Sequence, residues 1–357
     1  MNLAFFTFPY VPTEKSGKGV DRICYYIKKE LVNCNHNFRL VDGSDLKGRN
    51  AFSKMLSRAF NLHKFLKKDV GSHYLAATPY SGAILSLLKR KPLVTIIHDV
   101  VPFEKNNQIS YSIKSRIEKF AVKNRYKFSI KNSDLIIVPF QYTKEKLIEL
   151  FGLDGKKIKV VEYGIELTQT KEEIRSKKLK KNTFTVLFIG GLNPIERGGL
   201  IIPDIAKILS SNEIDIEFIV SAKRGLSNPI IEKVNGLGIS NMFKFTDFIP
   251  ESELDNVLRS SDLFLYPSFL GFSLLLLQAL ANGLPILVSK RLDNIEFATN
   301  LGYIVEDNSP EAFAKEILKI ATDVDLRASQ IESSFNFIQN RSASKMALKI
   351  IETVATL

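Results

Sequence analysis

The segment at residues 267–289 reads PSFLGFSLLLLQALANGLPILVS and predicts the end of one strand, a helix and the following strand. Turn-forming residues bracket the helix, YPS at 266–268 and NGLP at 282–285. Because Leu274–Leu277 leave it no polar face, we expect this helix to be buried on nearly every side. A helix N-terminus presents free N–H groups and a positive dipole, which favour phosphate. The segment is therefore either a phosphate site opening at residues 271–273 or a core helix alone.

The chain around this segment has 357 residues, 45% hydrophobic and 25% charged. That length predicts two domains, and that composition is typical of globular proteins. Apolar runs stay well short of the roughly 20 residues of a membrane-spanning helix. The start, MNLAFFTFPYVPTEK, lacks the features of a signal peptide, which predicts a cytoplasmic protein. Cys24 and Cys34 lack metal-ligand neighbours, so we expect neither a structural disulfide nor a zinc site.

Short β-branched or aromatic runs alternate with helical stretches along the chain, which is typical of βαβ units and parallel sheets. The predicted strands of the first series are 3–8, 38–42, 93–98, 134–139 and 158–163. Those of the second series are 184–190, 216–222, 243–248, 262–267, 285–289 and 302–305. We therefore expect an N-terminal domain at 1–165, a charged linker at 166–182 and a C-terminal domain at 183–341. The last helix, about 342–354, can close the second domain or pack back on the first.

Ligands of open α/β sheets bind beyond the carboxyl ends of the strands, and four segments there carry candidate residues. They are SGKGVDRI at 16–23, His98 with Asp99, the loop GLNPIERGG at 191–199, and the opening segment. A histidine at a strand end can donate to a substrate hydroxyl, and an arginine between glycines can bind a diphosphate with two hydrogen bonds. The alternatives are glycines that only form tight turns, a structural histidine and a surface arginine.

The formal net charge of +12 predicts a polyanionic partner, such as an anionic membrane, phosphorylated small molecules or nucleic acid. Residues 52–68, FSKMLSRAFNLHKFLKK, combine an apolar helical face with five cations and no acid, a pattern that fits a helix lying on an anionic membrane. A second basic run covers 113–131. Both runs fit equally well the solvated faces of helices packed on a sheet. Recognition signatures for nucleic acid are missing, so we expect no nucleic-acid partner.

The four segments, in this order on two domains, resemble glycosyltransferase family 4, a family of retaining enzymes. This resemblance implies an α/β protein of the GT-B fold, with two Rossmann-like, doubly wound domains facing each other across a cleft. SGKGVDRI is similar to the family's N-terminal Gly-Gly-x-Glu loop, with Lys18 for the first glycine and Asp21 for the glutamate. HDVVP at 98–102 resembles its His-Asp loop, and VVEYGIE at 160–166 resembles the segment that closes its first domain.

The opening segment resembles the family's signature Pro-Ser-x-x-Glu-Gly-Phe-Gly followed by Leu-Glu-Ala-Met-Ala-x-Gly-x-Pro. Eight positions match it: Gly271, Phe272, Leu274, Leu277, Ala279, Ala281, Gly283 and Pro285. Both glutamates of the signature are absent, since the first falls on Leu270 and the second on Gln278. Glutamine still accepts a hydrogen bond from a ribose hydroxyl, whereas leucine makes none to the transferred sugar. In the preceding loop, Arg197-Gly198 stands for the family's Lys-Gly pair, and the arginine of its Gly-Arg-Leu motif is missing.

The resemblance implies a nucleotide-sugar-dependent hexosyltransferase that acts with retention on a glycan or lipid-linked acceptor, without cofactor or metal. His98 and Arg197 are the expected catalytic residues. The expected donor-binding residues are Gly19, Gly190, Gly191, Arg197, Leu270, Gly271, Phe272, Ser273, Leu274 and Gln278. The expected acceptor-side residues are Gly17, Lys18, Asp21 and Asp99. Because both glutamates are absent, the alternative is a catalytically silent subunit that binds or stabilises a related glycosyltransferase.

Overall fold

The structure is a computed structural model that divides into two compact units, Met1–Tyr163 with Ala343–Leu357, and Gly164–Ser342. The residues it describes are 2–13, 19–42, 73–103, 113–167, 170, 172–173, 183–192, 194–223, 225–268, 272–290, 296, 298, 301 and 304–357, with the backbone alone at 113–119. Residues 52–68 and most of the expected linker lie outside this set. Each unit is built on a six-stranded parallel sheet, as the alternation of strands and helices predicted.

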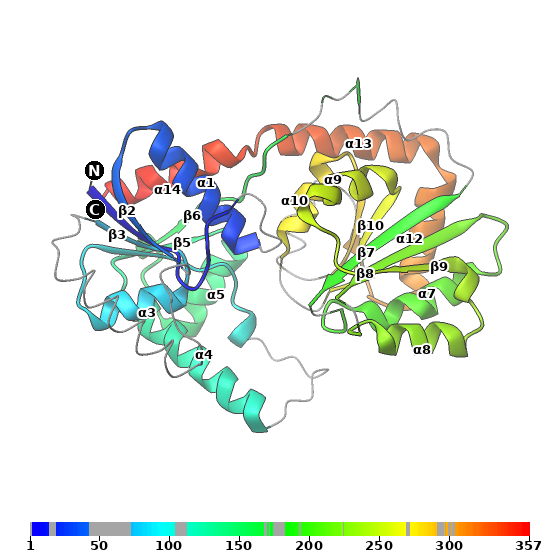
Figure 1. The fold of residues 1–357 in the computed structure, drawn as a ribbon, viewed down its shortest axis with the longest axis horizontal. Helices are drawn as coiled ribbons and strands as arrows, with labels where there is room; N and C mark the ends of the chain where they lie inside the picture. Colours follow the sequence, from blue (N-terminus) through cyan, green and yellow to red (C-terminus); the bar gives the residue numbers. More distant parts are fainter. Residues whose placement is uncertain are drawn as a thin grey trace. The chain divides into compact units, whose positions relative to one another are not determined.

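In the first unit the strand order is β2-β1-β3-β4-β5-β6. The strands are β1 (Asn2–Phe6), β2 (Asn37–Val41), β3 (His73–Ala76), β4 (Leu93–Ile96), β5 (Leu135–Val138) and β6 (Ile158–Val160). The helices are α1 (Gly19–Asn33), α3 (Pro79–Leu87), α4 (Ile113–Asn132), α5 (Gln141–Phe151) and the last helix, α14 (Ala343–Ala355). α1 packs beside α14 on one face of the sheet, and α3 packs beside α4 on the other (Figure 1).

One strand of this sheet, β3, was not predicted from the sequence. β3 has four residues, HYLA, and it pairs in parallel with β1 on one side and β4 on the other. This run has no β-branched residue, and tertiary pairing rather than local propensity makes it a strand. Its place beside β1 determines where the strand order of this sheet reverses.

In the second unit the strand order is β12-β11-β10-β7-β8-β9. The strands are β7 (Phe184–Gly191), β8 (Ile216–Ala222), β9 (Phe243–Thr246), β10 (Leu263–Tyr266), β11 (Ile286–Ser289) and β12 (Ile304–Val305). The helices α7 (Ile202–Leu209), α8 (Asn228–Gly236) and α12 (Pro310–Thr322) cover one face, where their apolar residues join a core with Phe188, Phe218 and Leu265. The helices α9 (Glu251–Ser260), α10 (Leu274–Ala281) and α13 (Val324–Gln339) lie on the other face (Figure 1).

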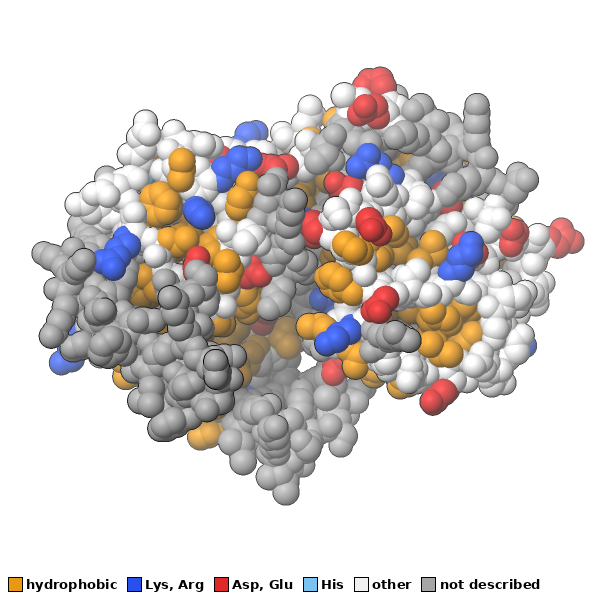
Figure 2. All heavy atoms as spheres, in the orientation of Figure 1, with side chains coloured by type: hydrophobic (Ala, Val, Ile, Leu, Met, Phe, Trp, Pro, Cys, Tyr) orange, Lys and Arg blue, Asp and Glu red, His pale blue; other side chains and the backbone are white. Residues whose placement is uncertain are grey.

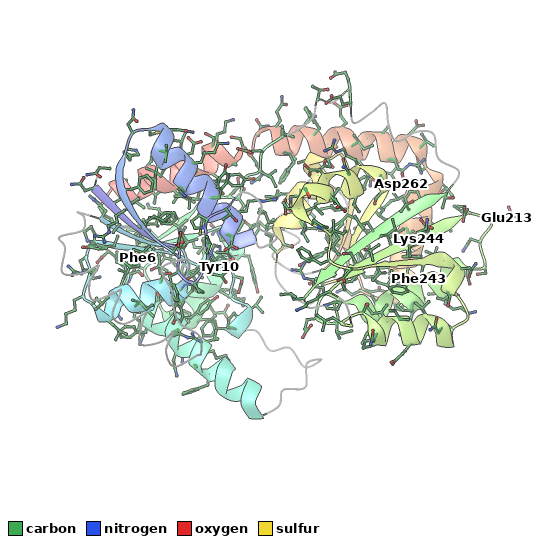
Figure 3. All side chains as sticks on the ribbon, viewed as in Figure 1. Phe6, Tyr10, Glu213, Phe243, Lys244 and Asp262 are labelled. Atoms are coloured by element: carbon green, nitrogen blue, oxygen red, sulfur yellow. The ribbon has the colours of Figure 1, made fainter. Side chains whose placement is uncertain are left out.

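Each sheet has one place where the strand order reverses, and ligands of such sheets bind at that place. In the first unit it lies between β1 and β3, and in the second between β7 and β10. Asp262, labelled in Figure 3, helps to join the second pair, because its carboxylate accepts from the Thr185 backbone N–H at 2.9 Å. On the face drawn in Figure 2, the coloured basic and acidic side chains are interspersed rather than gathered into one patch. The side chains at the two reversals, rather than a charged patch on this face, therefore define the candidate binding sites.

Candidate functional site

At the reversal of the second sheet, the loop after β7 lies directly against the loop after β10. Gly198 has a φ of +82°, a conformation that L side chains rarely adopt. A Cβ atom added there would lie 1.9 Å from the carbonyl oxygen of Pro267. Glycine at 198 is therefore required both by the backbone conformation and by the close approach of the two loops, and it positions its neighbour Arg197 beside the start of α10.

Arg197 and the start of α10 converge on one oxygen atom. The Arg197 Nη1 atom donates to Ser273 Oγ at 3.4 Å, and the guanidinium lies 5.9 Å from the centroid of the Tyr266 ring. Ser273 is the N-cap of α10, and its Oγ also accepts from the Leu275 backbone N–H at 3.4 Å. The structure thus starts the helix at Leu274, later than the predicted opening at 271–273. A hydroxyl oxygen that accepts from an arginine and a helix N–H occupies a position suited to a phosphate oxygen.

The helix itself is as buried as the sequence predicted. Seven of its eight residues are buried, and Leu275 is partly exposed. Gly283, directly after the C-cap Asn282, has a φ of +62°, which fits the predicted turn. The core-helix interpretation of the opening segment is confirmed, and a phosphate site at its first turn stays a prediction.

Gln278, at the position of the second family glutamate, is tied to an acid on the neighbouring helix. It is 7% exposed, and its Nε2 atom donates to Glu251 Oε1 at 3.3 Å. One turn further, Asn282 Nδ2 donates to Asp255 Oδ1 at 3.0 Å. A carboxylate from the first turn of α9 therefore lies beside position 278, which sequence comparison along α10 alone does not reveal.

The other expected donor residues are placed unevenly. Gly190 packs tightly, because a Cβ there would lie 2.5 Å from Pro194 Cβ, whereas Gly191 has a φ of +59° and open space around it. Phe272 directly precedes the N-cap of α10. Leu270 and Gly271 lie outside the described residues, as do the acceptor-side residues Gly17 and Lys18. Gly19 is the first residue of α1 in the first unit and is exposed.

In the first unit, His98 follows β4 and has both ring nitrogens engaged. Its Nε2 atom lies 2.7 Å from the carbonyl oxygen of Ala77, and its Nδ1 atom contacts the hydroxyl of Tyr163. A carbonyl can only accept, so Nε2 carries the proton and Nδ1 accepts from Tyr163. Burial lowers the pKa of His98 from 6.5 to about 4, so the ring is neutral at pH 7. The expected donation to a substrate hydroxyl therefore requires one of these two hydrogen bonds to open.

Asp99, the next residue, lies near the phenols of buried Tyr163 and half-buried Tyr126. Its Oδ1 atom accepts from the Val101 backbone N–H at 3.1 Å. Burial, followed by the negative charge of Asp99, raises the pKa values of Tyr126 and Tyr163 well above 10. Burial, followed by Asp21 in the first turn of α1, raises that of Tyr10, which lies beyond β1 (Figure 3). Asp21 and Asp99, two carboxylates predicted from the sequence, thus both act on the phenol of Tyr10.

These residues border a pocket of about 440 Å³ at the reversal of the first sheet. Its lining comes from the segments after β1, β3 and β4 and from α1 and α4: Phe8, Pro9, Tyr10, Val20, Thr78, Pro79, Tyr80, His98, Asp99, Val122, Arg125 and Tyr126. The sequence analysis found His98 and Asp99 but missed the aromatic residues and Arg125. A signal was present, because a Pro-Tyr pair follows β1 as residues 9–10 and follows its neighbour β3 as residues 79–80.

Comparison with known proteins gives a consistent result. Residues 18–169 match the family described as Glycosyltransferase Family 4, and residues 169–337 match Glycosyl transferases group 1. UDP-Gal:alpha-D-GlcNAc-diphosphoundecaprenol alpha-1,3-galactosyltransferase of Escherichia coli is 27% identical over 286 residues, 76% of this chain and 71% of that protein.

Two solved structures are similar over their full length. Anabaena HepE, crystallised with UDP and glucose, is 16% identical with a TM-score of 0.72, covering 100% of both chains. WaaG, a glycosyltransferase involved in lipopolysaccharide biosynthesis, is 17% identical with a TM-score of 0.71, covering 99% of both. At these identities the two structures bear on the fold, and the fold they share with this chain is GT-B.

Proposed function

The chain belongs to glycosyltransferase family 4, and on that premise we propose that it moves a hexose from a nucleotide diphosphate sugar to a glycan or lipid-linked acceptor. The observation that carries the proposal is the convergence of Arg197 and the first turn of α10 on Ser273 Oγ. Both groups are donors with positive charge or partial positive charge. They suit the diphosphate of a donor substrate.

In the proposed reaction the diphosphate lies at the start of α10, where it takes over the donors that now meet at Ser273. As the bond between the sugar carbon and the phosphate oxygen breaks, negative charge grows on that oxygen, and Arg197 with the helix dipole stabilises it. The acceptor oxygen bonds to the sugar carbon on the face that the phosphate leaves, and its proton passes to the departing phosphate. The anomeric configuration is then retained, and the proposal requires neither a carboxylate nucleophile nor a metal ion.

The ribose of the donor is proposed to bind Gln278 and Glu251 together. The amide of Gln278 donates to Glu251, which leaves the Gln278 oxygen to accept from one ribose hydroxyl. The charged Glu251 carboxylate, with two oxygens, is the stronger acceptor for the adjacent hydroxyl. This pair would do the work of the family's second glutamate.

The acceptor is proposed to bind at the pocket of the first unit, and His98 is proposed as a sugar contact. The pocket combines apolar walls with few polar groups, as small-molecule sites do. The E. coli relative supports a lipid-linked acceptor, since its name includes a diphosphoundecaprenol group. No helix among the described residues is long and apolar enough to cross a membrane.

A screen of nucleotide sugars tests the proposal directly. Purified protein is mixed with UDP, GDP and ADP derivatives of glucose, galactose and N-acetylglucosamine, and thermal stabilisation and release of the nucleoside diphosphate are both measured. We expect one nucleotide family to raise the melting temperature and to be hydrolysed slowly. Stabilisation without turnover in the presence of acceptors would instead indicate the silent subunit. Neither effect with any nucleotide sugar would refute the proposal.

We further propose that residues 52–68 bring the protein to an anionic membrane surface inside the cell. Each lysine near such a surface contributes about 1 kcal/mol of binding. Reversing Lys64, Lys67 and Lys68 to glutamate should therefore abolish sedimentation with phosphatidylserine vesicles at low salt, and added salt should weaken binding of the wild type. Equal sedimentation of both proteins would remove this part of the proposal.

A further inference from the structure

The pocket of the first unit has two charged lining residues, Asp99 and Arg125, in walls that are otherwise mostly aromatic and apolar. Phe8 and Tyr80 form part of one wall, with ring centroids 5.3 Å apart. Such walls suit the apolar faces of a sugar ring, and Asp99, as an acceptor-only carboxylate, suits its hydroxyl groups. The role of Arg125 is not explained by a neutral sugar.

Arg125 is held firmly but is not neutralised. Its Nε atom donates to the Ala121 carbonyl at 3.2 Å, and its guanidinium carbon lies 5.2 Å from the centroid of the Tyr80 ring. Within the described part of the chain, no carboxylate forms an ion pair with it. These contacts use Nε and the face of the guanidinium plane, so the two terminal amino groups remain available in a planar, always charged fork.

We propose that the acceptor bound in this pocket is a phosphorylated sugar, whose ring lies between the aromatic walls and whose phosphate is bound by Arg125. This inference rests on the proposed transferase function. Asp99 accepts hydrogen bonds from the hydroxyl groups of the sugar. Asp99 and Arg125 therefore contact different parts of the acceptor. Arg125 thereby acts as a specificity-determining residue, because a neutral acceptor leaves its charge without a partner in a half-buried site.

Binding of small probes separates this site from the donor site. Calorimetry is performed with the α-1-phosphates of glucose, galactose and N-acetylglucosamine, and with the matching methyl glycosides. The proteins are the wild type, Arg125→Ala, Arg125→Lys, and Arg197→Ala, which removes the cation of the proposed donor site. Lys127→Ala is the matched control, since Lys127 is an exposed cation on the same helix that does not line the pocket.

We expect at least one hexose 1-phosphate to bind the wild type well above its methyl glycoside, and Arg125→Ala to weaken it about 10- to 100-fold. Arg125→Lys should bind the hexose phosphate more weakly than the wild type and more tightly than Arg125→Ala, because lysine keeps the charge without the planar guanidinium fork. Arg197→Ala and Lys127→Ala should bind like the wild type. Loss of hexose-phosphate binding in Arg197→Ala but not in Arg125→Ala, or a methyl glycoside that binds as tightly as the phosphate, would overturn the inference.

A second experiment distinguishes a lipid-linked acceptor from a soluble sugar phosphate. The same hexose is presented as a diphosphate ester of a long-chain alcohol in phosphatidylcholine vesicles, and Arg125 should be required there too. Tighter binding to the vesicles identifies a lipid-linked acceptor, and tighter binding to the free ester identifies a soluble one. Nucleotide-sugar hydrolysis by the wild type is measured alongside. Hydrolysis that persists while hexose phosphates fail to bind the wild type would refute this inference and leave the transferase proposal standing.

Discussion

The two strand-order reversals lie in sheets of different strand order, and they also differ in their side chains. In the second unit, the reversal brings together donors and positive charge, with Arg197 and a helix N-terminus meeting at Ser273. In the first unit it encloses a pocket with aromatic walls, two residues of opposite charge, Asp99 and Arg125, and a histidine that is neutral at pH 7. The strand order predicts where a ligand binds, and the side chains around each reversal predict a diphosphate in the second unit and, in the first, a sugar ring that also carries a charged group.

The largest effect on stability is expected at Gly198, where the two loops of the second reversal leave no room for a side chain. Gly198→Ala places a methyl group against Pro267, and separating the two loops should lower the free energy of unfolding by roughly 2–4 kcal/mol, strain included. Gly225→Ala is the matched control, because its φ of +81° is almost the same and open space surrounds it, so about 1 kcal/mol should be lost. Urea unfolding measures both, and equal losses would show that the loops do not depend on this contact.

The next effect concerns His98 at the first reversal. Its pKa in the folded chain, about 4, lies below 6.5, so between these pH values the unfolded chain binds a proton that the folded chain does not. Stability should therefore fall as the pH falls from 6.5 to 4, by at most about 3 kcal/mol. His98→Gln should flatten this part of the curve of unfolding free energy against pH, while the other histidines contribute equally to both proteins. Parallel curves would place His98 in a solvated environment.

A third effect distinguishes the two reversals by charge. Arg197→Ala should weaken binding of a nucleoside diphosphate about 10- to 100-fold, because a charge-assisted hydrogen bond is lost. Lys244→Ala removes an exposed cation of the same unit, paired with Glu217 at 2.8 Å (Figure 3), and should change little. Isothermal calorimetry provides the comparison. Unchanged affinity in Arg197→Ala would mean that α10 is a core helix without a phosphate site.

The smallest effect concerns the replacement for the missing family glutamate. Gln278→Ala should cost about 1 kcal/mol of nucleoside diphosphate binding, a lost neutral hydrogen bond. Gln278→Glu, which restores the family residue, should not help, because it sets a second carboxylate against Glu251. Adding Glu251→Gln to that variant should recover binding. A gain in affinity from Gln278→Glu alone would contradict the proposed pairing of these two side chains.

Most of the strands were predicted from local patterns, and the one exception is informative. Eleven strands had recognisable β-branched or aromatic runs, whereas β3, HYLA, has no β-branched residue and becomes a strand because β1 and β4 pair with it. β3 lies at the reversal of the first sheet, and the nearby pocket residues Tyr80 and Arg125 were not predicted. The roles expected for the individual site residues remain predictions that the experiments above address.

The sequence by itself determined the alternation of strands and helices and the burial of α10, which follow from periodicity, and motifs within single segments carried the resemblance that implies the family and its GT-B fold. The tertiary structure decided which distant groups meet. Glu251 faces Gln278 across 27 positions, Arg197 reaches Ser273 across 76, and Tyr163 occupies the ring nitrogen of His98 across 65. Side chains so far apart in the chain leave no joint periodic signal. Only the parallel sheets, which bring the carboxyl ends of their strands to one edge, place them within hydrogen-bonding distance.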